Sequence, residues 1–240
     1  MQGRAVNIIT CPGNHDVNWE LIKADPEAKH LAFSPYVTFR NSVSNTSHFG
    51  ANTPPERLYE ISWVDGDPPV IVVSLNSATI EGPADHRGYI GDSQLDNAMK
   101  EANAHPHWAD SFRIAMFHHH LVPVSTIESK IASESLLADS AAVKKRLLKE
   151  GFSLVVHGHR HHAHAELSGD GTHSMVIVGC GSSGVTRHER GEQPLQFNRI
   201  VVRSSARRPT VQVITYEFDV TDRAWRKALS SPPRTFTVGG

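Results

Sequence analysis

Cysteine is nearly absent from this chain of 240 residues, which contains only Cys11 and Cys180. Two cysteines so far apart cannot build the disulfide framework of a small secreted domain, and they lack the close spacing of a zinc or redox pair. Long apolar runs are missing as well, because none approaches the roughly 20 residues that span a bilayer. No signal-peptide core follows Met1. The sequence therefore predicts a reduced, cytoplasmic protein without a membrane segment.

An excess of charge of either sign is also lacking. The 24 Lys and Arg residues nearly balance the 25 Asp and Glu residues, and the net charge is −1. No global electrostatic field would draw such a protein to nucleic acid or to an anionic membrane. We therefore expect neither partner, and a bound phosphate group must be held by local contacts. The length suits one large domain with a sizeable core, and a single α/β domain is the simplest organisation.

Histidine is the one residue type in excess, with 16 copies in the chain. Nine of these fall in three short stretches: His15; His118, His119 and His120; and His157, His159, His161, His162 and His164. The three stretches follow apolar runs over residues 6–10, 112–117 and 153–157, each of which is typical of a buried strand. Because open α/β sheets bind ligands at the carboxyl edge of their strands, this clustering predicts a functional site at one sheet edge.

Between and after these runs the pattern alternates between strand and helix. Residues 18–57 contain four prolines and predict a long excursion that forms a rim over the site, with weak helical character around Trp19 to Leu31. Residues 58–64 and 70–75 flank a loop rich in glycine and proline, which predicts a hairpin. The spacing of apolar residues predicts helices over 94–104 and 139–150.

From residue 165 onward the pattern changes to strands without helices. Strands are predicted at 165–167, 175–179, 198–203 and 211–218. Strands that follow one another without helices favour an antiparallel sheet. The segment after Trp225 contains Pro232 and Pro233 and is expected to be loosely ordered.

The polar residues at the predicted strand ends suit metal-assisted phosphate chemistry. Imidazole nitrogens combined with amide and carboxylate oxygens favour divalent Mn, Fe or Zn. In an extended segment His159 and His161 face the same way, so they could hold one ion each or share one. Two such ions can bridge a hydroxide, lower its pKa and hold a phosphoryl group for in-line attack. His15 could then donate a hydrogen bond to a phosphoryl or leaving-group oxygen, with Asp16 orienting its ring.

Three motifs occur in a specific order: Gly13-Asn14-His15-Asp16, then His118 in a histidine run after a strand, then Gly158-His159-Arg160-His161. In this order they resemble the calcineurin-like metallophosphoesterase superfamily, and a strand, glycine turn and helix over residues 75–95 also look like that family. The resemblance implies a layered α/β sandwich of two mixed sheets flanked by helices. The domain would span residues 1–225, with a tail over residues 226–240.

The resemblance also implies an activity, a metal-dependent phosphoester hydrolase with a hydroxide that bridges two divalent ions. The run from Phe117 to His120 is similar to bacterial cyclic-nucleotide phosphodiesterases, so a small phosphodiester such as a cyclic nucleotide is the expected substrate. Asn14, His118 and His159 would bind the second metal ion, and His161 would bind the first. His15 would be the hydrogen-bond donor in the transition state, supported by Asp16.

The neighbouring side chains have simpler expected roles. His119 and His120 would lie behind the ligands or at the rim, because successive side chains of a strand alternate between its faces. His162 and His164 would lie on the surface or serve packing. Cys11 would be a small buried apolar residue, and Arg160 an exposed loop arginine.

The sequence departs from the family pattern at its start. The family opens with an Asp-x-His motif and a Gly-Asp motif that supply carboxylates, and no Asp-x-His occurs here. The Gly-Asp pairs at 66–67, 91–92 and 169–170 follow no suitable strand upstream of Gly13. The chain therefore looks like a family member that lacks the first two strands. We therefore expect impaired activity. We also expect the chain to bind two metal ions poorly, so that it could hold a single ion.

Two other functions stay open. A non-catalytic binding module of the same fold would retain the histidines without the chemistry. A nuclease of the same superfamily is the second alternative, which the near-neutral charge and the lack of a basic stripe disfavour.

Overall fold

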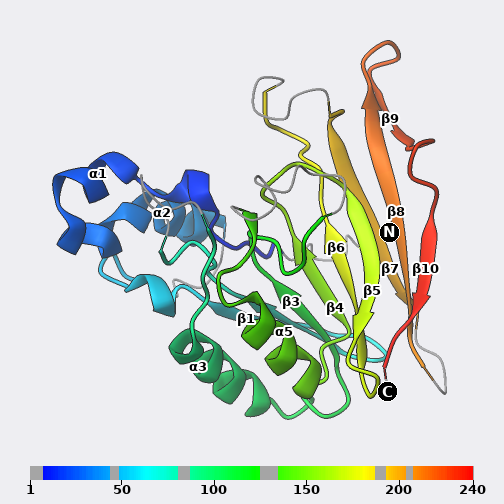
Figure 1. Cartoon of the computed structure of the whole chain (residues 1–240), viewed down its shortest axis with the longest axis horizontal. Coiled ribbons are helices and arrows are strands. Elements are labelled where there is room, and N and C mark those ends of the chain that lie inside the picture. The colour runs from blue at the N-terminus through cyan, green and yellow to red at the C-terminus, as the bar shows by residue number, and fades with distance from the viewer. Residues whose placement is uncertain are drawn as a thin grey trace.

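The structure is a computed structural model that describes residues 8–43, 49–80, 87–124, 135–186, 193–203 and 208–239. Figure 1 shows two β-sheets packed against each other, with helices α3 (Asp92–Asn103) and α5 (Ser140–Lys149) on the far side of the larger sheet. The larger sheet has the strand order β1-β2-β3-β4-β6-β5, and the smaller one has the order β10-β8-β7, with β9 paired to β8. The predicted α/β fold with two layered sheets is confirmed, but only the larger sheet is mixed, whereas two mixed sheets were predicted.

The larger sheet consists of β1 (Glu60–Val64), β2 (Val70–Ser74), β3 (Phe112–Met116), β4 (Leu154–His157), β5 (His164–Gly169) and β6 (Ser174–Gly179). Strands β2, β3, β4 and β6 run parallel, whereas β1 and β5 are antiparallel at the two edges. The hairpin predicted over residues 58–64 and 70–75 is the pair β1 and β2. Because parallel strands end at the same edge, β3 and β4 lead side by side into His118 and Gly158.

The described helices are η1 (Asn14–Asp16), α1 (Trp19–Ala24), η2 (Pro26–Phe33), α2 (Ser34–Val43), η3 (Pro55–Arg57), α3 (Asp92–Asn103) and α5 (Ser140–Lys149). Helix α3 buries Leu95, Ala98, Met99 and Ala102, a helical spacing that places all four on the sheet. Helix α5 ends before Gly151, whose φ of +70° suits a left-handed helix cap. Both helices confirm the predictions. Within the described ranges, no helix combines the length and apolar character needed to cross a lipid bilayer.

Helices α1 and η2 confirm the helical character predicted around Trp19 to Leu31, and α2 and η3 add further helical turns to the rim predicted over residues 18–57. The segment from α1 to η3 has a core of its own, which includes Phe33, Tyr36 and Leu58. The two faces of the larger sheet pack differently. On one face Val73, Ala115 and Ile177 meet helices α3 and α5, and on the other face the side chains of β3, β4 and β6 meet the smaller sheet.

The smaller sheet consists of β7 (Gln196–Arg203), β8 (Thr210–Asp219), β9 (Ala224–Lys227) and β10 (Arg234–Thr237). All of its pairs are antiparallel, as predicted for the strands at 198–203 and 211–218. The strand predicted at 175–179 is β6, which joins the larger sheet and runs parallel to β4. The expectation of a loosely ordered tail after Trp225 is wrong. Strand β10 pairs with β8, Phe236 packs between the sheets and Val238 is fully buried. The sequence around the tail prolines hides this pairing because its partner is distant in the chain.

The prediction of a strand over residues 6–10 is wrong for the part that the structure describes. Residues 6 and 7 lie outside the described residues, and residues 8–10 form no strand. Both edges of β2, beside which this segment runs, are already occupied by β1 and β3. The carbonyl of Thr10 instead accepts hydrogen bonds from side chains, from Ser74 Oγ at 2.5 Å and from the Tyr36 hydroxyl at 3.3 Å. Side chains therefore anchor the segment that leads to Asn14.

Candidate metal centre

Three side chains from distant parts of the chain meet at the carboxyl edge of β3 and β4. The Nε2 atom of His118 lies 2.7 Å from Asn14 Oδ1 and 3.0 Å from His159 Nδ1. Each of these atoms can offer a lone pair to a cation. The structure thus assembles one oxygen and two nitrogen donors from three of the predicted metal ligands, which we call the donor cluster.

The electrostatic environment keeps the two imidazoles of the donor cluster neutral. Burial lowers the pKa of His118 well below its ordinary value, and the neighbouring imidazoles of His119, His15 and His161 lower that pKa further. Burial followed by the charges of His119 and His118 likewise lowers the pKa of His159. Neutral imidazole is the form that binds metal ions.

The turn that carries Asn14 is fixed from two directions. Gly13 packs directly on the ring of His118, and a Cβ atom at position 13 would lie 2.6 Å from His118 Nδ1. Only glycine permits this close approach. The Oδ2 atom of Asp16 accepts the backbone N–H of Gly13 at 2.8 Å and so closes the turn η1. Asp16 thus holds the turn, while its expected support of the exposed His15 stays a prediction.

The backbone that carries His118 is held by the buried hydroxyl of Ser77. Ser77 Oγ accepts the backbone N–H groups of His118 and His119, both at 3.1 Å, and lies 2.9 Å from His119 Nδ1. One hydroxyl offers one donor and two acceptor positions, so these three contacts use all of them. The sequence gives no signal of this role, because Ser77 and its partners are 41 and 42 residues apart.

Replacing Ser77 by alanine is expected to lower the free energy of unfolding by about 1–3 kcal/mol, because two buried N–H groups lose their acceptor. The turn should also hold His118 less firmly, so the affinity for a divalent ion should fall. Urea unfolding and a metal titration measure the two effects. The exposed Ser183 provides the control, since Ser183→Ala should change neither. Wild-type stability in Ser77→Ala would contradict the role given to this hydroxyl.

Further histidines form a buried layer behind the donor cluster. His119 and His120 are 0% and 2% exposed, so both lie behind the ligands rather than at the rim. The ring of His157 lies 4.7 Å from that of His120 and 5.1 Å from that of His164. Burial lowers the pKa of His120 to about 3 and also lowers the pKa of His157 and His164. The neutral rings of His120, His157 and His164 pack against one another, and packing is one of the roles expected for His164.

The donor cluster fits one metal ion better than two. Among the residues that the structure describes, no three His, Cys, Asp or Glu side chains come together as a metal site, so Asn14 must supply the third donor. The three donors are neutral, and the nearby Asp16 carboxylate is bonded to Gly13. His159 and His161 have positive φ angles of 78° and 54°, which turn the loop sharply between them. His161, the one ligand predicted for the other ion, belongs to no group of three His, Cys, Asp or Glu side chains in the described ranges.

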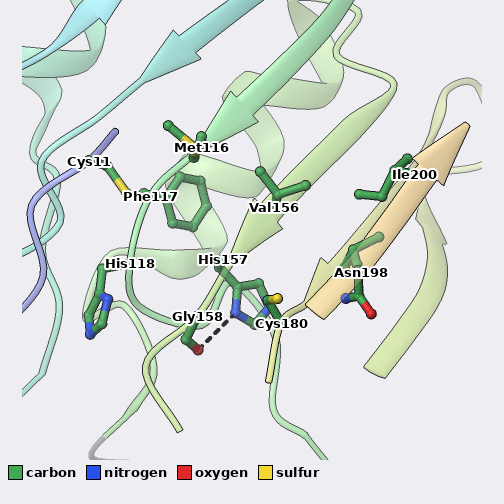
Figure 2. Close-up of a pocket in the computed structure, with 11 residues that line it drawn as sticks. Cys11, Met116, Phe117, His118, Val156, His157, Gly158, Cys180, Asn198 and Ile200 are labelled. Atoms are coloured by element: carbon green, nitrogen blue, oxygen red, sulfur yellow. Dashed lines mark hydrogen bonds between the residues drawn. The ribbon is translucent and has the colours of Figure 1, made fainter. Parts of the chain in front are cut away.

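A cavity of about 380 Å³ lies beside the donor cluster, between the two sheets. Figure 2 shows Met116 and Val156 on one wall and Ile200 on the other, with His118 at the side. Asn198 is already paired, since its amide donates to the Gly179 carbonyl and its Oδ1 accepts from Thr215. Burial of its thiol raises the pKa of the lining Cys11 to about 12, although the residue as a whole is half-buried and not fully buried as predicted. The polar chemistry is therefore concentrated at the His118 side.

Comparisons with known proteins add a family match. The family model for calcineurin-like phosphoesterases matches residues 1–163. No curated protein matches the chain. Among solved structures, the crystal structure of Chaetomium thermophilum Vps29 is similar over 72% of this chain and 100% of that chain, with 12% sequence identity and a TM-score of 0.28.

Proposed function

Since the chain belongs to the calcineurin-like phosphoesterase family, we propose that it hydrolyses phosphoesters with a divalent metal ion and that phosphodiesters are its substrates. The observation that carries this proposal is the donor cluster, in which Asn14 Oδ1 and His159 Nδ1 lie 2.7 and 3.0 Å from His118 Nε2. Members of the family typically bind divalent metals, and two neutral nitrogens with one oxygen suit Mn, Fe or Zn.

The residues of the site divide into holding and donating roles. Asn14, His118 and His159 would hold the ion, and Ser77 and Gly13 keep two of these ligands in place. A bound divalent ion supplies a Lewis acid and lowers the pKa of water. His15 is exposed and directly follows Asn14 in η1, so its ring would donate a hydrogen bond to a phosphoryl or leaving-group oxygen. A small phosphodiester such as a cyclic nucleotide is the first substrate to test.

The test is a titration with Mn²⁺ and Zn²⁺, combined with hydrolysis of bis(p-nitrophenyl) phosphate. Asn14→Ala removes the one oxygen donor and should weaken metal binding more than about tenfold, or about 1.4 kcal/mol. Asn97→Ala on α3 is the matched control and should bind the ion as the wild type does. Wild-type affinity in Asn14→Ala would show that the donor cluster is not the metal site.

The same titration separates hydrolysis from the alternative function. We expect one ion per chain to bind more tightly than a second, because neutral donors cannot balance the charge of two ions. A chain that binds its ion through Asn14 but does not cleave the phosphodiester would be a metal-holding binding module. The absence of a group of three His, Cys, Asp or Glu ligands in the described part of the chain favours that second candidate.

A further inference from the structure

The smaller sheet has one face turned away from the rest of the described protein. Val211 and Val213 of β8 and Ile200 of β7 pack between the two sheets. Since side chains alternate along a strand, the intervening residues point to the opposite, outer face. In Figure 1 helices α3 and α5 lie beyond the larger sheet, and no described helix covers this outer face.

Four aromatic rings gather on the outer face, from Phe197 of β7, Tyr216 and Phe218 of β8, and Trp225 of β9. Phe197 and Tyr216 are register partners whose rings stack with centroids 5.0 Å apart. Trp225 meets Phe197 at 4.8 Å and Phe218 at 5.3 Å, in both cases edge to face. Trp225 remains 38% exposed. Trp225 therefore presents an exposed ring, and the half-buried rings of Phe197, Tyr216 and Phe218 pack around it on the same face.

The charge on this face has a single sign. Its outward positions are Phe197, Arg199, Val201 and Arg203; Thr210, Gln212, Ile214, Tyr216 and Phe218; Trp225 and Lys227; and Thr235 and Thr237. They include three exposed cations and no carboxylate. The acidic residues of β8, Glu217 and Asp219, point to the inner face. The net charge of −1 for the whole chain therefore does not reveal the local positive charge of this face.

The aromatic rings lie at the same end of the molecule as the donor cluster. Next to Phe197 in β7, Asn198 donates a hydrogen bond to the carbonyl of Gly179 at 2.9 Å. Gly179 ends β6 and pairs with His157, the last residue of β4 before the histidine loop. A chain molecule that crosses the outer face could therefore continue toward the histidine edge.

We propose that the outer face of the smaller sheet binds single-stranded nucleic acid. Unpaired bases stack on aromatic rings, and the phosphates between them pair with Arg199, Arg203 and Lys227. A duplex hides its base faces from such rings, which makes a single strand the better fit. This binding does not require the hydrolysis proposed above, and it differs from the absence of nucleic acid expected from the overall charge.

The test is fluorescence anisotropy with a labelled oligothymidylate of about 12 nucleotides, within the roughly 4–16 nucleotides that a sheet-based module covers. The double variant Arg199→Ala/Arg203→Ala changes only exposed side chains. It should weaken binding at least about fivefold and flatten the salt dependence by about 1.4 units of slope, because two phosphate contacts are lost at about 0.7 each. Lys100→Ala/Lys149→Ala, exposed on α3 and α5, is the matched control and should bind as the wild type does.

A second variant separates stacking from charge. Trp225→Leu keeps an apolar side chain but removes a π surface, so it should weaken binding without changing the salt slope. Circular dichroism shows whether the sheet remains folded. The proposal is overturned by no binding of the oligothymidylate, by unchanged binding in Arg199→Ala/Arg203→Ala, or by equal affinity for a duplex of the same length. Binding of phosphatidylserine vesicles without binding of the oligonucleotide would assign the face to a membrane and overturn it too.

Discussion

Metal-free protein is expected to lose several kcal/mol of stability between about pH 6.5 and pH 5. Burial lowers the pKa of five imidazoles: His118, His120, His157, His159 and His164. Below the ordinary histidine pKa of about 6.5, the unfolded chain binds protons that the folded chain refuses. Stability is therefore fully present above about pH 6.5 and falls as the pH drops toward the folded pKa values, which for His120 is about 3.

The magnitude follows from the number of rings. Each imidazole contributes a slope of up to about 1.4 kcal/mol per pH unit, so two or three of them already approach the whole stability of a typical domain, about 5–15 kcal/mol. Urea unfolding in a metal chelator at a series of pH values measures the slope. His157→Gln should make it shallower, whereas the exposed His173→Gln should leave it unchanged. Stability that stays constant from pH 7 to pH 5 would contradict the neutral, buried state of these rings.

The substitution Gly13→Ala adds a single methyl group, and we expect that group to abolish tight metal binding. The new Cβ atom would lie 2.6, 2.8 and 2.9 Å from Nδ1, Cε1 and Cγ of His118, so the whole ring must move. The ring has little freedom to do so, because its Nε2 contacts Asn14 and His159 and its backbone is held by Ser77. We expect a loss of stability of about 1–3 kcal/mol and a fall in metal affinity of more than about tenfold.

A double-mutant cycle tests the cause of this effect. In a His118→Ala background the ring is gone, and Gly13→Ala should then change stability little. Gly184→Ala is the control for alanine itself, because a Cβ atom there would have no neighbour within 4 Å. Equal destabilisation by Gly13→Ala with and without the His118 ring would show that the glycine serves the backbone alone.

Much of the fold could be predicted because its signals are local. The apolar spacing of α3 and α5 and the turn residues between β1 and β2 each act within a few positions of the chain. The predictions were wrong where the formation of a strand depends on a free edge of another strand. Strand β10 forms because β8 offers an edge, while residues 8–10 form no strand because both edges of β2 are taken. Neither fact leaves a trace in the local pattern.

In the candidate site, too, the features with local signals could be predicted and those that depend on distant contacts could not. Asn14, His118 and His159 could be named from motifs at strand ends, and the structure brings their donor atoms together. Alternation along a strand cannot decide among His118, His119 and His120, because β3 ends at Met116 and the chain turns there. The turn is set by Ser77, whose hydroxyl reaches across 41 residues of sequence. Such a contact requires the folded chain.

The backbone of the histidine loop shows where this protein departs from a purely stable scaffold. His159 and His161 both adopt left-handed conformations, which glycine or asparagine adopts with less strain. A designer who wanted only a robust sandwich would place glycine at both positions and gain stability. The chain instead has imidazoles at both positions. The loop therefore accepts backbone strain in order to place these two side chains. Stabilising consensus design at these two residues should therefore be avoided in any engineered version.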